Sequence, residues 1–110
     1  MKLKIKDQIA LVLESNNNEI DFFRKFDDIY HKIQTKNIIV SLTDVQIQDS
    51  NFIEKILKIS VSHEEGKHSF VIISPSSICD KLPENLIWVP TLKEAVDLIE
   101  MDEMQRDLEF

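Results

Sequence analysis

Three adjacent polar residues, Asp49, Ser50 and Asn51, stand between an apolar run and an amphipathic segment. Short oxygen-bearing side chains in this position are typical of a helix N-terminus, where they accept hydrogen bonds from free backbone N–H groups. The same N–H groups and the helix dipole favour a phosphate, so the hydroxyl of Ser50 is also a candidate site of phosphorylation. The N-cap is the simpler interpretation, and both remain open from the residues alone.

The stretch from His63 to His68, HEEGKH, is close to the HExxH motif of zinc proteases, but its second histidine comes one residue late. The extra residue takes the two imidazoles off a common helix face, and Gly66 is expected to end the helix between them. We therefore interpret His63 and His68 as solvent-facing loop residues and expect no metal site. His31 lies among charged neighbours in a helical pattern, so we expect it at the surface.

The remaining reactive residue types do not indicate catalysis. Gly66 is the single glycine, which excludes the Walker loop and the dinucleotide-binding glycine pattern, because both need several glycines near phosphate. Cys79 is the single cysteine and has no histidine nearby in the sequence, so we interpret it as a buried filler and not as a nucleophile. We expect a protein that is not an enzyme and needs no cofactor.

The composition predicts one globular domain covering residues 1–110. The chain is 43% hydrophobic and 30% charged, with a formal net charge of −7. Its basic residues are scattered, whereas nucleic-acid binding needs clustered Lys and Arg, so we expect protein or small-molecule partners and no nucleic acid. A single cysteine, no signal-peptide pattern and no apolar run near the roughly 20 residues of a membrane span predict a cytoplasmic protein without membrane insertion.

The elements that must position these residues follow from hydrophobic periodicity. The pattern predicts five strands, at residues 1–6, 9–13, 37–42, 69–73 and 86–89. It predicts about four helices: 19 to about 35, 50 to about 63, a short helix or turn at 75–82, and a final helix that begins at a Thr91–Glu94 capping box.

The order of these elements predicts the fold class. Residues 37–42 are mostly apolar, so this strand is placed centrally in the sheet. The alternation of strands and helices after Asn37 implies parallel strands, and residues 1–13 should add an antiparallel hairpin at one side. The expected fold is therefore α/β, with a mixed, mostly parallel sheet of about five strands covered by about four helices.

The same periodicity selects the side chains that should face the core. In the helix from residue 19 they are Ile20, Phe23, Phe26, Tyr30 and Ile33. In the helix from residue 50 they are Phe52, Ile53, Ile56, Leu57, Ile59 and Ser60. In the final helix they are Leu92, Ala95, Val96 and Ile99.

The segment from Asn37 to Leu57, NIIVSLTDVQIQDSNFIEKIL, resembles the signature of the STAS domain, the anti-sigma factor antagonist family. In that signature an apolar strand, a leucine-small-x-valine turn and an Asp-Ser pair precede the second helix. The resemblance extends over most of the chain, from the leading pair of strands to the closing strand and helix. It implies a single STAS-like domain over residues 1–110.

By this resemblance Ser50 corresponds to the serine that a partner kinase phosphorylates, and Asp49 to the acidic residue beside it. The implied partner is an anti-sigma factor or a serine kinase. The residues expected to contact it are Asp44, Asp49, Ser50, Asn51 and Phe52. The family usually has a small residue and a glycine where this chain has Asn51 and Phe52. The ring of Phe52 would either obstruct a docking kinase or serve as the docking contact itself.

The ending from Val89, VPTLKEAVDLIEMDEMQRDLEF, also resembles small proteins of the Bacteroidota, some of which are labelled ribonuclease Z. That activity requires the HxHxDH motif of the metallo-β-lactamases and several further zinc ligands. The chain has three histidines and lacks this motif, so we exclude a zinc nuclease.

Three functions from different classes follow, and the sequence leaves the oligomeric state open. The first is a regulatory module that binds its partner when unphosphorylated and releases it when Ser50 is phosphorylated. The second is a constitutive subunit of a larger assembly, such as the STAS-like partner of an ABC transporter ATPase, which an exposed apolar patch around Phe52 would favour. The third is a sensor that holds a small molecule at the carboxyl ends of the strands, near Asp44 and Asp49–Asn51.

Overall fold

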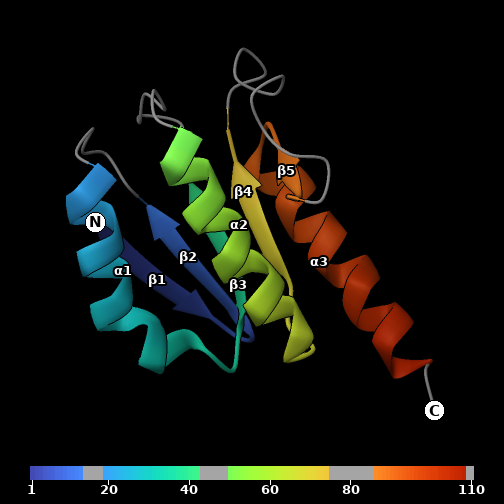
Figure 1. Cartoon of the computed structure of the whole chain (residues 1–110). Helices are drawn as coiled ribbons and strands as arrows, with labels where there is room; N and C mark the ends of the chain where they lie inside the picture. The colour runs from blue at the N-terminus through green and yellow to red at the C-terminus, as the bar shows by residue number, and fades with distance from the viewer. Residues whose placement is uncertain (14–18, 43–49, 75–85, 109–110) are drawn as a thin grey trace.

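The computed structural model describes residues 1–13, 19–42, 50–74 and 86–108 (Figure 1). In chain order its elements are β1 (Lys2–Lys6), β2 (Ile9–Leu13), α1 (Glu19–Ile33), β3 (Asn37–Ser41), α2 (Ser50–Glu65), β4 (Phe70–Ile73), β5 (Trp88–Val89) and α3 (Leu92–Asp107). The short helix predicted at 75–82, with Cys79, lies outside the described residues. Within the described ranges no helix combines the length and the apolar character needed to cross a bilayer.

The five strands form one sheet in the order β1-β2-β3-β4-β5. β1 pairs antiparallel with β2, and the three following pairs are parallel, which confirms the predicted hairpin and the parallel remainder. The hairpin turns at Asp7, whose φ of 54° lies in the left-handed region that aspartate adopts more readily than most residues. β3 is buried along its whole length, as expected of a strand covered on both faces.

α1 and α2 cover one face of the sheet and enclose the larger part of the core (Figure 1). Four phenylalanine rings from these helices and from β4 lie there, none more than 2% exposed: Phe22, Phe26, Phe52 and Phe70. The centroid of the Phe22 ring is 5.4 Å from that of Phe52 and 5.8 Å from that of Phe26. The Phe26 and Phe70 centroids are 6.4 Å apart, so one aromatic cluster joins both helices to the sheet.

The apolar stripe of α1 is wider than predicted. Phe22, which the prediction left out, is buried, whereas Phe23 is half-buried. Phe23 faces α2, where its ring lies 5.1 Å from the Phe52 ring and 5.3 Å from Nζ of Lys55. Contact with both the sheet and α2 requires more than one apolar row on the helix. The side chain of Ile20 lies outside the described residues, and the other predicted positions are buried or half-buried: Phe26, Tyr30 and Ile33.

Phe52, in the first turn of α2, has a ring that is 2% exposed. A ring so deeply buried is unavailable to a partner, so we remove Phe52 from the expected contact residues. The burial of this ring also removes the support that an exposed apolar patch around it would have given to a constitutive subunit. The other predicted core positions of α2 are buried or half-buried: Ile53, Ile56, Leu57, Ile59 and Ser60.

α3 covers the other face of the sheet, where it packs mainly on β4 and β5. A second, smaller core forms beneath it from two residues of the helix and three of the central strands: Ala95, Ile99, Ile39, Val71 and Ile73. The two cores lie on opposite sides of β3, because neighbouring residues of a strand point to opposite faces.

The first turn of α3 has the predicted capping residues. The backbone N–H of Glu94 donates to Oγ1 of Thr91 at 3.2 Å, and the Thr91 hydroxyl donates to Oε2 of Glu94 at 3.0 Å. Leu92, which the periodicity places inward, is instead 46% exposed. β5 ends at Val89, so the first turn of α3 lies at the margin of the sheet, where less surface is available to cover a side chain.

Replacing Phe52 by alanine should lower the free energy of unfolding by about 3–5 kcal/mol, because it leaves a cavity among the rings of α1 and α2. Urea denaturation followed by circular dichroism measures the change. The control is Leu92→Ala, at a half-exposed position, with an expected loss below about 1 kcal/mol. Equal losses in the two variants would contradict the core position of Phe52.

Candidate functional site

α2 begins at Ser50, as the sequence predicts. The helix runs antiparallel to β3, so its N-terminus lies at the carboxyl end of the parallel strands, the upper end of the sheet in Figure 1. The first N–H groups of any helix lack partners within it and are available to an acceptor. Asp44, Asp49 and the side chain of Ser50 lie outside the described residues.

The first turn of α2 presents neighbouring residues in two directions. Asn51 is exposed, whereas the next residue, Phe52, is buried, because successive side chains on a helix point about 100° apart. The outer side of α2 continues from Asn51 through Glu54, Lys55 and Lys58, all exposed. α2 thus has a polar outer side, and on its inner side the buried Phe52 ring packs the first turn into the core.

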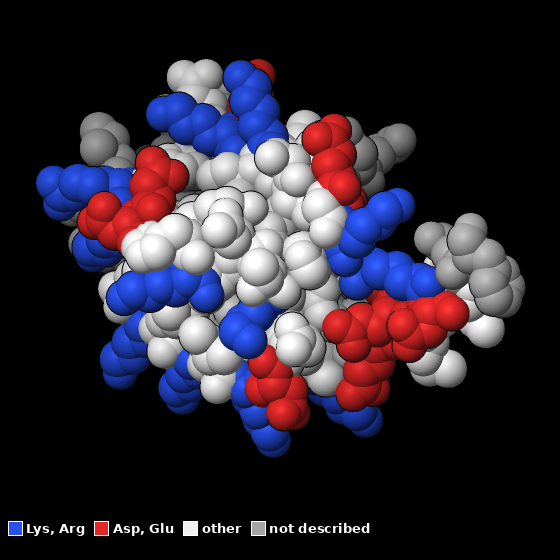
Figure 2. All heavy atoms as spheres, turned by 90° about the horizontal axis from the view of Figure 1, so that it is seen from below, with Lys and Arg blue, Asp and Glu red and all other residues white. Residues whose placement is uncertain are grey.

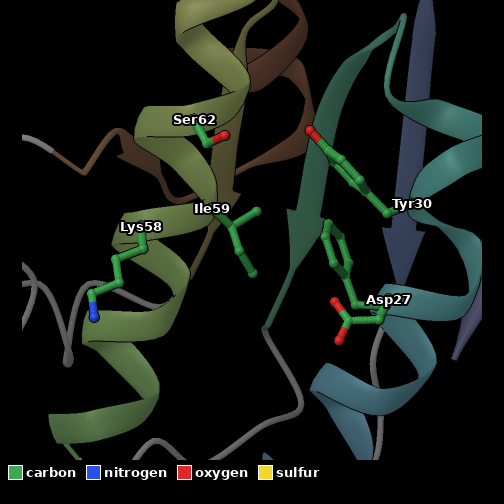
Figure 3. Close-up of a pocket in the computed structure, with 6 residues that line it drawn as sticks. Asp27, Tyr30, Lys58, Ile59 and Ser62 are labelled. Carbon is green, nitrogen blue, oxygen red and sulfur yellow. The ribbon is translucent and has the colours of Figure 1, made fainter.

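An open groove of about 280 Å³ lies between α1 and α2 (Figure 3). Its lining residues come from both helices: Phe26, Asp27, Tyr30, Lys58, Ile59 and Ser62. The side chains of Asp27, Tyr30 and Ile59 point toward the space between the helices, whereas Lys58 lies on the outer side of α2. The groove therefore has a largely apolar floor with charged groups at its rim.

Tyr30, which lines the groove, forms a hydrogen bond with His63. The Tyr30 hydroxyl lies 2.8 Å from Nδ1 of His63, and Nε2 of His63 lies 2.7 Å from the carbonyl oxygen of Lys36. A carbonyl only accepts, so Nε2 carries the hydrogen and Nδ1 accepts from the tyrosine. His63 therefore links α2 to α1 and to the residue that precedes β3.

This position of His63 corrects the prediction of a solvent-facing loop residue, since its side chain is only 1% exposed. α2 extends to Glu65, two residues beyond the predicted end, and His63 continues the row of buried positions Phe52, Ile56 and Ser60. That helical spacing was a signal in the sequence. Both ring nitrogens are occupied by hydrogen bonds, and the described residues hold no group of three side chains suited to a metal ion.

Burial lowers the pKa of His63, because the charged form loses its hydration. The carbonyl of Lys36 opposes this shift, whereas the neighbouring His68 and Arg106 add to it. Burial also raises the pKa of Tyr30. His63 is therefore a neutral imidazole at pH 7, in which Nε2 donates to the Lys36 carbonyl and Nδ1 accepts from the Tyr30 hydroxyl.

A second polar cluster lies at the opposite end of the sheet from the start of α2. Nδ2 of Asn37 donates to Oε1 of Glu103 at 2.6 Å, and Oδ1 of Asn37 accepts from the backbone N–H of Ser69 at 2.8 Å. The Ser69 hydroxyl donates to Oδ2 of Asp102 at 2.9 Å and accepts from Nη2 of Arg106 at 2.6 Å. The cluster fastens the second half of α3 to the starts of β3 and β4.

Figure 2 shows this end of the molecule, with uncharged surface at its centre and charged side chains around the margin. Two open hollows of about 270 and 320 Å³ flank the cluster, and both are lined by His68 and Arg106. The buried amide and hydroxyl of the cluster bond to neighbouring side chains, which is what burial of polar groups requires. We therefore interpret the cluster as structural.

The sequence did not indicate the Tyr30–His63 hydrogen bond or the polar cluster around Asn37, because the bonded residues are far apart along the chain. Tyr30 and His63 are separated by 33 positions, and Asn37 and Arg106 by 69. Only the fold brings such residues together. An asparagine at the start of a buried apolar strand was a partial signal, since a buried amide needs partners.

No protein-family model matches the chain, and no curated protein matches its sequence. Its structure is similar to the NMR structure of the protein TM1081, with a TM-score of 0.64 and 22% identity over 89% of this chain and 86% of that one. It is also similar to a chain from the molecular architecture of the stressosome, a signal integration and transduction hub. That match has a TM-score of 0.63 and 14% identity over 91% of this chain and 96% of the other.

The fold is STAS-like. At these identities the likeness establishes the fold alone, and it agrees with the order of strands and helices that the resemblance of residues 37–57 implies. In this STAS-like fold the start of α2 lies at the carboxyl edge of the sheet, and the α1–α2 groove lies on the same side of the sheet as that helix.

We expect the protein to lose stability as the pH falls below about 6.5, because the unfolded chain then binds a proton that the buried His63 resists. The contribution of neutral His63 is complete above that pH and is lost as the pH falls through the lowered pKa. Burial raises the pKa of Glu64, which acts in the opposite direction, with stability lost as the pH rises through that pKa.

The variant His63→Gln should therefore flatten the decline in urea midpoint between about pH 7.5 and 5.5, while Glu64 remains in place. The matched control is His31→Gln, which replaces an exposed histidine of α1 and should keep the wild-type slope. An unchanged slope in His63→Gln would contradict the assignment.

Proposed function

We propose that this chain is a non-catalytic regulatory module that binds a partner protein through the outer surface of α2 and the groove between α1 and α2. The partner that the family resemblance implies is an anti-sigma factor or a serine kinase, with phosphorylation of Ser50 weakening the contact. The observation that carries the proposal is the continuity of α2, which begins at Ser50 and forms one wall of the groove.

The chemistry of the groove favours an inserted protein side chain. Its volume of about 280 Å³ is at or below the range of small-molecule sites, roughly 300–1,000 Å³, and it is open to solvent. Ile59 and Tyr30 offer apolar contact, and Asp27 offers a carboxylate at the rim. The complementary partner segment carries an apolar side chain with a basic group beside it.

The proposed switch is electrostatic. A phosphate on Ser50 adds a charge of about −1.5 to −2 at a helix N-terminus, where the dipole stabilises it, so the fold is retained. The first turn of α2 has no acidic residue, so the phosphate would stand beside the single adjacent carboxylate of Asp49. The added charge acts on an acidic surface of the partner across the interface.

The stressosome neighbour is described as a signal integration and transduction hub, which supports a role in a signalling assembly. The alternative function, a constitutive subunit of a larger assembly, would be supported by an exposed apolar surface around Phe52. The ring of Phe52 is buried, so this support is lost. We therefore propose the switchable module alone.

Ser50→Asp should abolish capture of the partner, whereas Ser50→Asn, which matches it in shape but carries no charge, should capture as the wild type does. A tagged pull-down from the source cell, with captured proteins identified by mass spectrometry, measures this. Recovery of a serine kinase or anti-sigma factor by the wild type and Ser50→Asn only is the expected result. Equal recovery of one partner by all three proteins would refute the switch.

Ile59→Gln should weaken binding of the partner so identified by about tenfold, since it places an amide in the apolar floor of the groove. Val61→Gln is the matched control, because Val61 is 42% exposed on the same helix and does not line the groove. Isothermal titration calorimetry measures both affinities. A larger loss for Val61→Gln would place the contact elsewhere.

A further inference from the structure

The two faces of the sheet are covered unequally by the described helices. α1 and α2 lie on one face, and α3 lies on the other, over β4 and β5. Strands are spaced about 4.8 Å apart and a helix is about 10 Å wide, so a five-stranded sheet has the width of two helices. As far as the described residues extend, the second face therefore has room for one more helix beside α3.

The surface beside α3 is an apolar row with a basic border. Ile9, Leu11 and Leu13 of β2 alternate toward this face and are half-buried. Directly opposite them on β1 are three exposed lysines, paired in register as Lys6 with Ile9, Lys4 with Leu11 and Lys2 with Leu13. We name this surface the β1–β2 strip.

α3 carries the complementary features on its outward side. Met101, Met104 and Leu108 are 66%, 68% and 75% exposed, and their spacing of three and four residues aligns them opposite the buried positions Ala95 and Ile99. The exposed acid Asp97 continues this row toward the start of α3, and the exposed acids Glu100 and Asp107 lie along one side of it.

We propose that the β1–β2 strip binds the outward side of α3 from a second copy of this chain, forming a two-fold symmetric dimer. α3 protrudes from the second face of the sheet, whereas the β1–β2 strip beside it is not covered by a described helix. In the dimer the second faces of the two copies face each other, related by a two-fold axis. α3 of each copy then lies on the β1–β2 strip of the other copy, so the same contact forms twice, as an isologous interface requires.

Apolar and charged groups match in this arrangement. Glu103 bonds to Asn37, the register partner of Ile9. Met101 and Met104 therefore lie level with the Ile9 end of the apolar row and meet it there. The exposed acids of α3 meet the lysines of β1. Complementary charge selects the orientation even though the whole chain has a net charge of −7. The α1–α2 face remains outside the dimer interface and stays available to a partner.

Sedimentation velocity of the full chain from about 1 µM to about 1 mM tests the proposal. The wild type should pass from monomer to dimer in this range, and Met101→Gln/Met104→Gln should raise the dissociation constant about tenfold or more. Val61→Gln, on α2, should leave it unchanged. A wild type that stays monomeric throughout, or a double variant that dimerises as the wild type does, would overturn the proposal.

A charge exchange tests the predicted contact more sharply. Lys4→Glu/Lys6→Glu makes the strip acidic, and Asp97→Lys/Glu100→Lys reverses the charge of two of the exposed acids on the outward side of α3. Each variant alone should dimerise at least tenfold more weakly than wild type, because like charges then face each other in both contacts. An equimolar mixture should form a heterodimer, since both of its contacts again pair opposite charges. Failure of the mixture to associate, with circular dichroism showing both variants folded, would refute the interface.

Discussion

The burial of β3 on both faces is the constraint on which the rest of the structure depends. Ile38 and Val40 point into the core beneath α1 and α2, and Ile39 points into the core beneath α3. A strand of this kind needs helices on both sides and parallel neighbours on both edges. The crossovers through α1 and α2 advance in the same direction along the sheet, so both helices lie on one face. The start of α2 is thereby fixed at the carboxyl edge.

α2 is held at its two ends by different forces. Near its start the Phe52 ring packs into the aromatic cluster, and near its end His63 bonds to the Tyr30 hydroxyl and to the Lys36 carbonyl. In the proposed function, a helix fixed in this way does not need to move for a phosphate at its N-terminus to alter binding. A change in surface charge on a rigid element is sufficient, which is the simplest form of switch.

Local patterns in the sequence predicted the elements and their order, because hydrophobic periodicity and capping residues act over a few positions. The start of α2 at Ser50 and the Thr91–Glu94 cap are examples. The same patterns misplaced His63, and left out Phe22, because the side of a helix that becomes buried depends on the helices packed beside it. The contacts of Asn37 with Ser69 and Glu103 join distant parts of the chain and follow only from the topology. Within the candidate site, Asp44 and Asp49 remain predictions.

The two edge strands of the sheet, β1 and β5, are poorly suited to pairing with strands of other molecules. β5 has two residues, so it offers a very short template of backbone hydrogen bonds, and β1 is bordered by Lys2, Lys4 and Lys6. Short strands and lysines are devices by which proteins prevent strand-to-strand growth between molecules. Addition of further strands from another molecule is therefore disfavoured at both edges of this sheet, whereas its helical surfaces stay free for specific contacts.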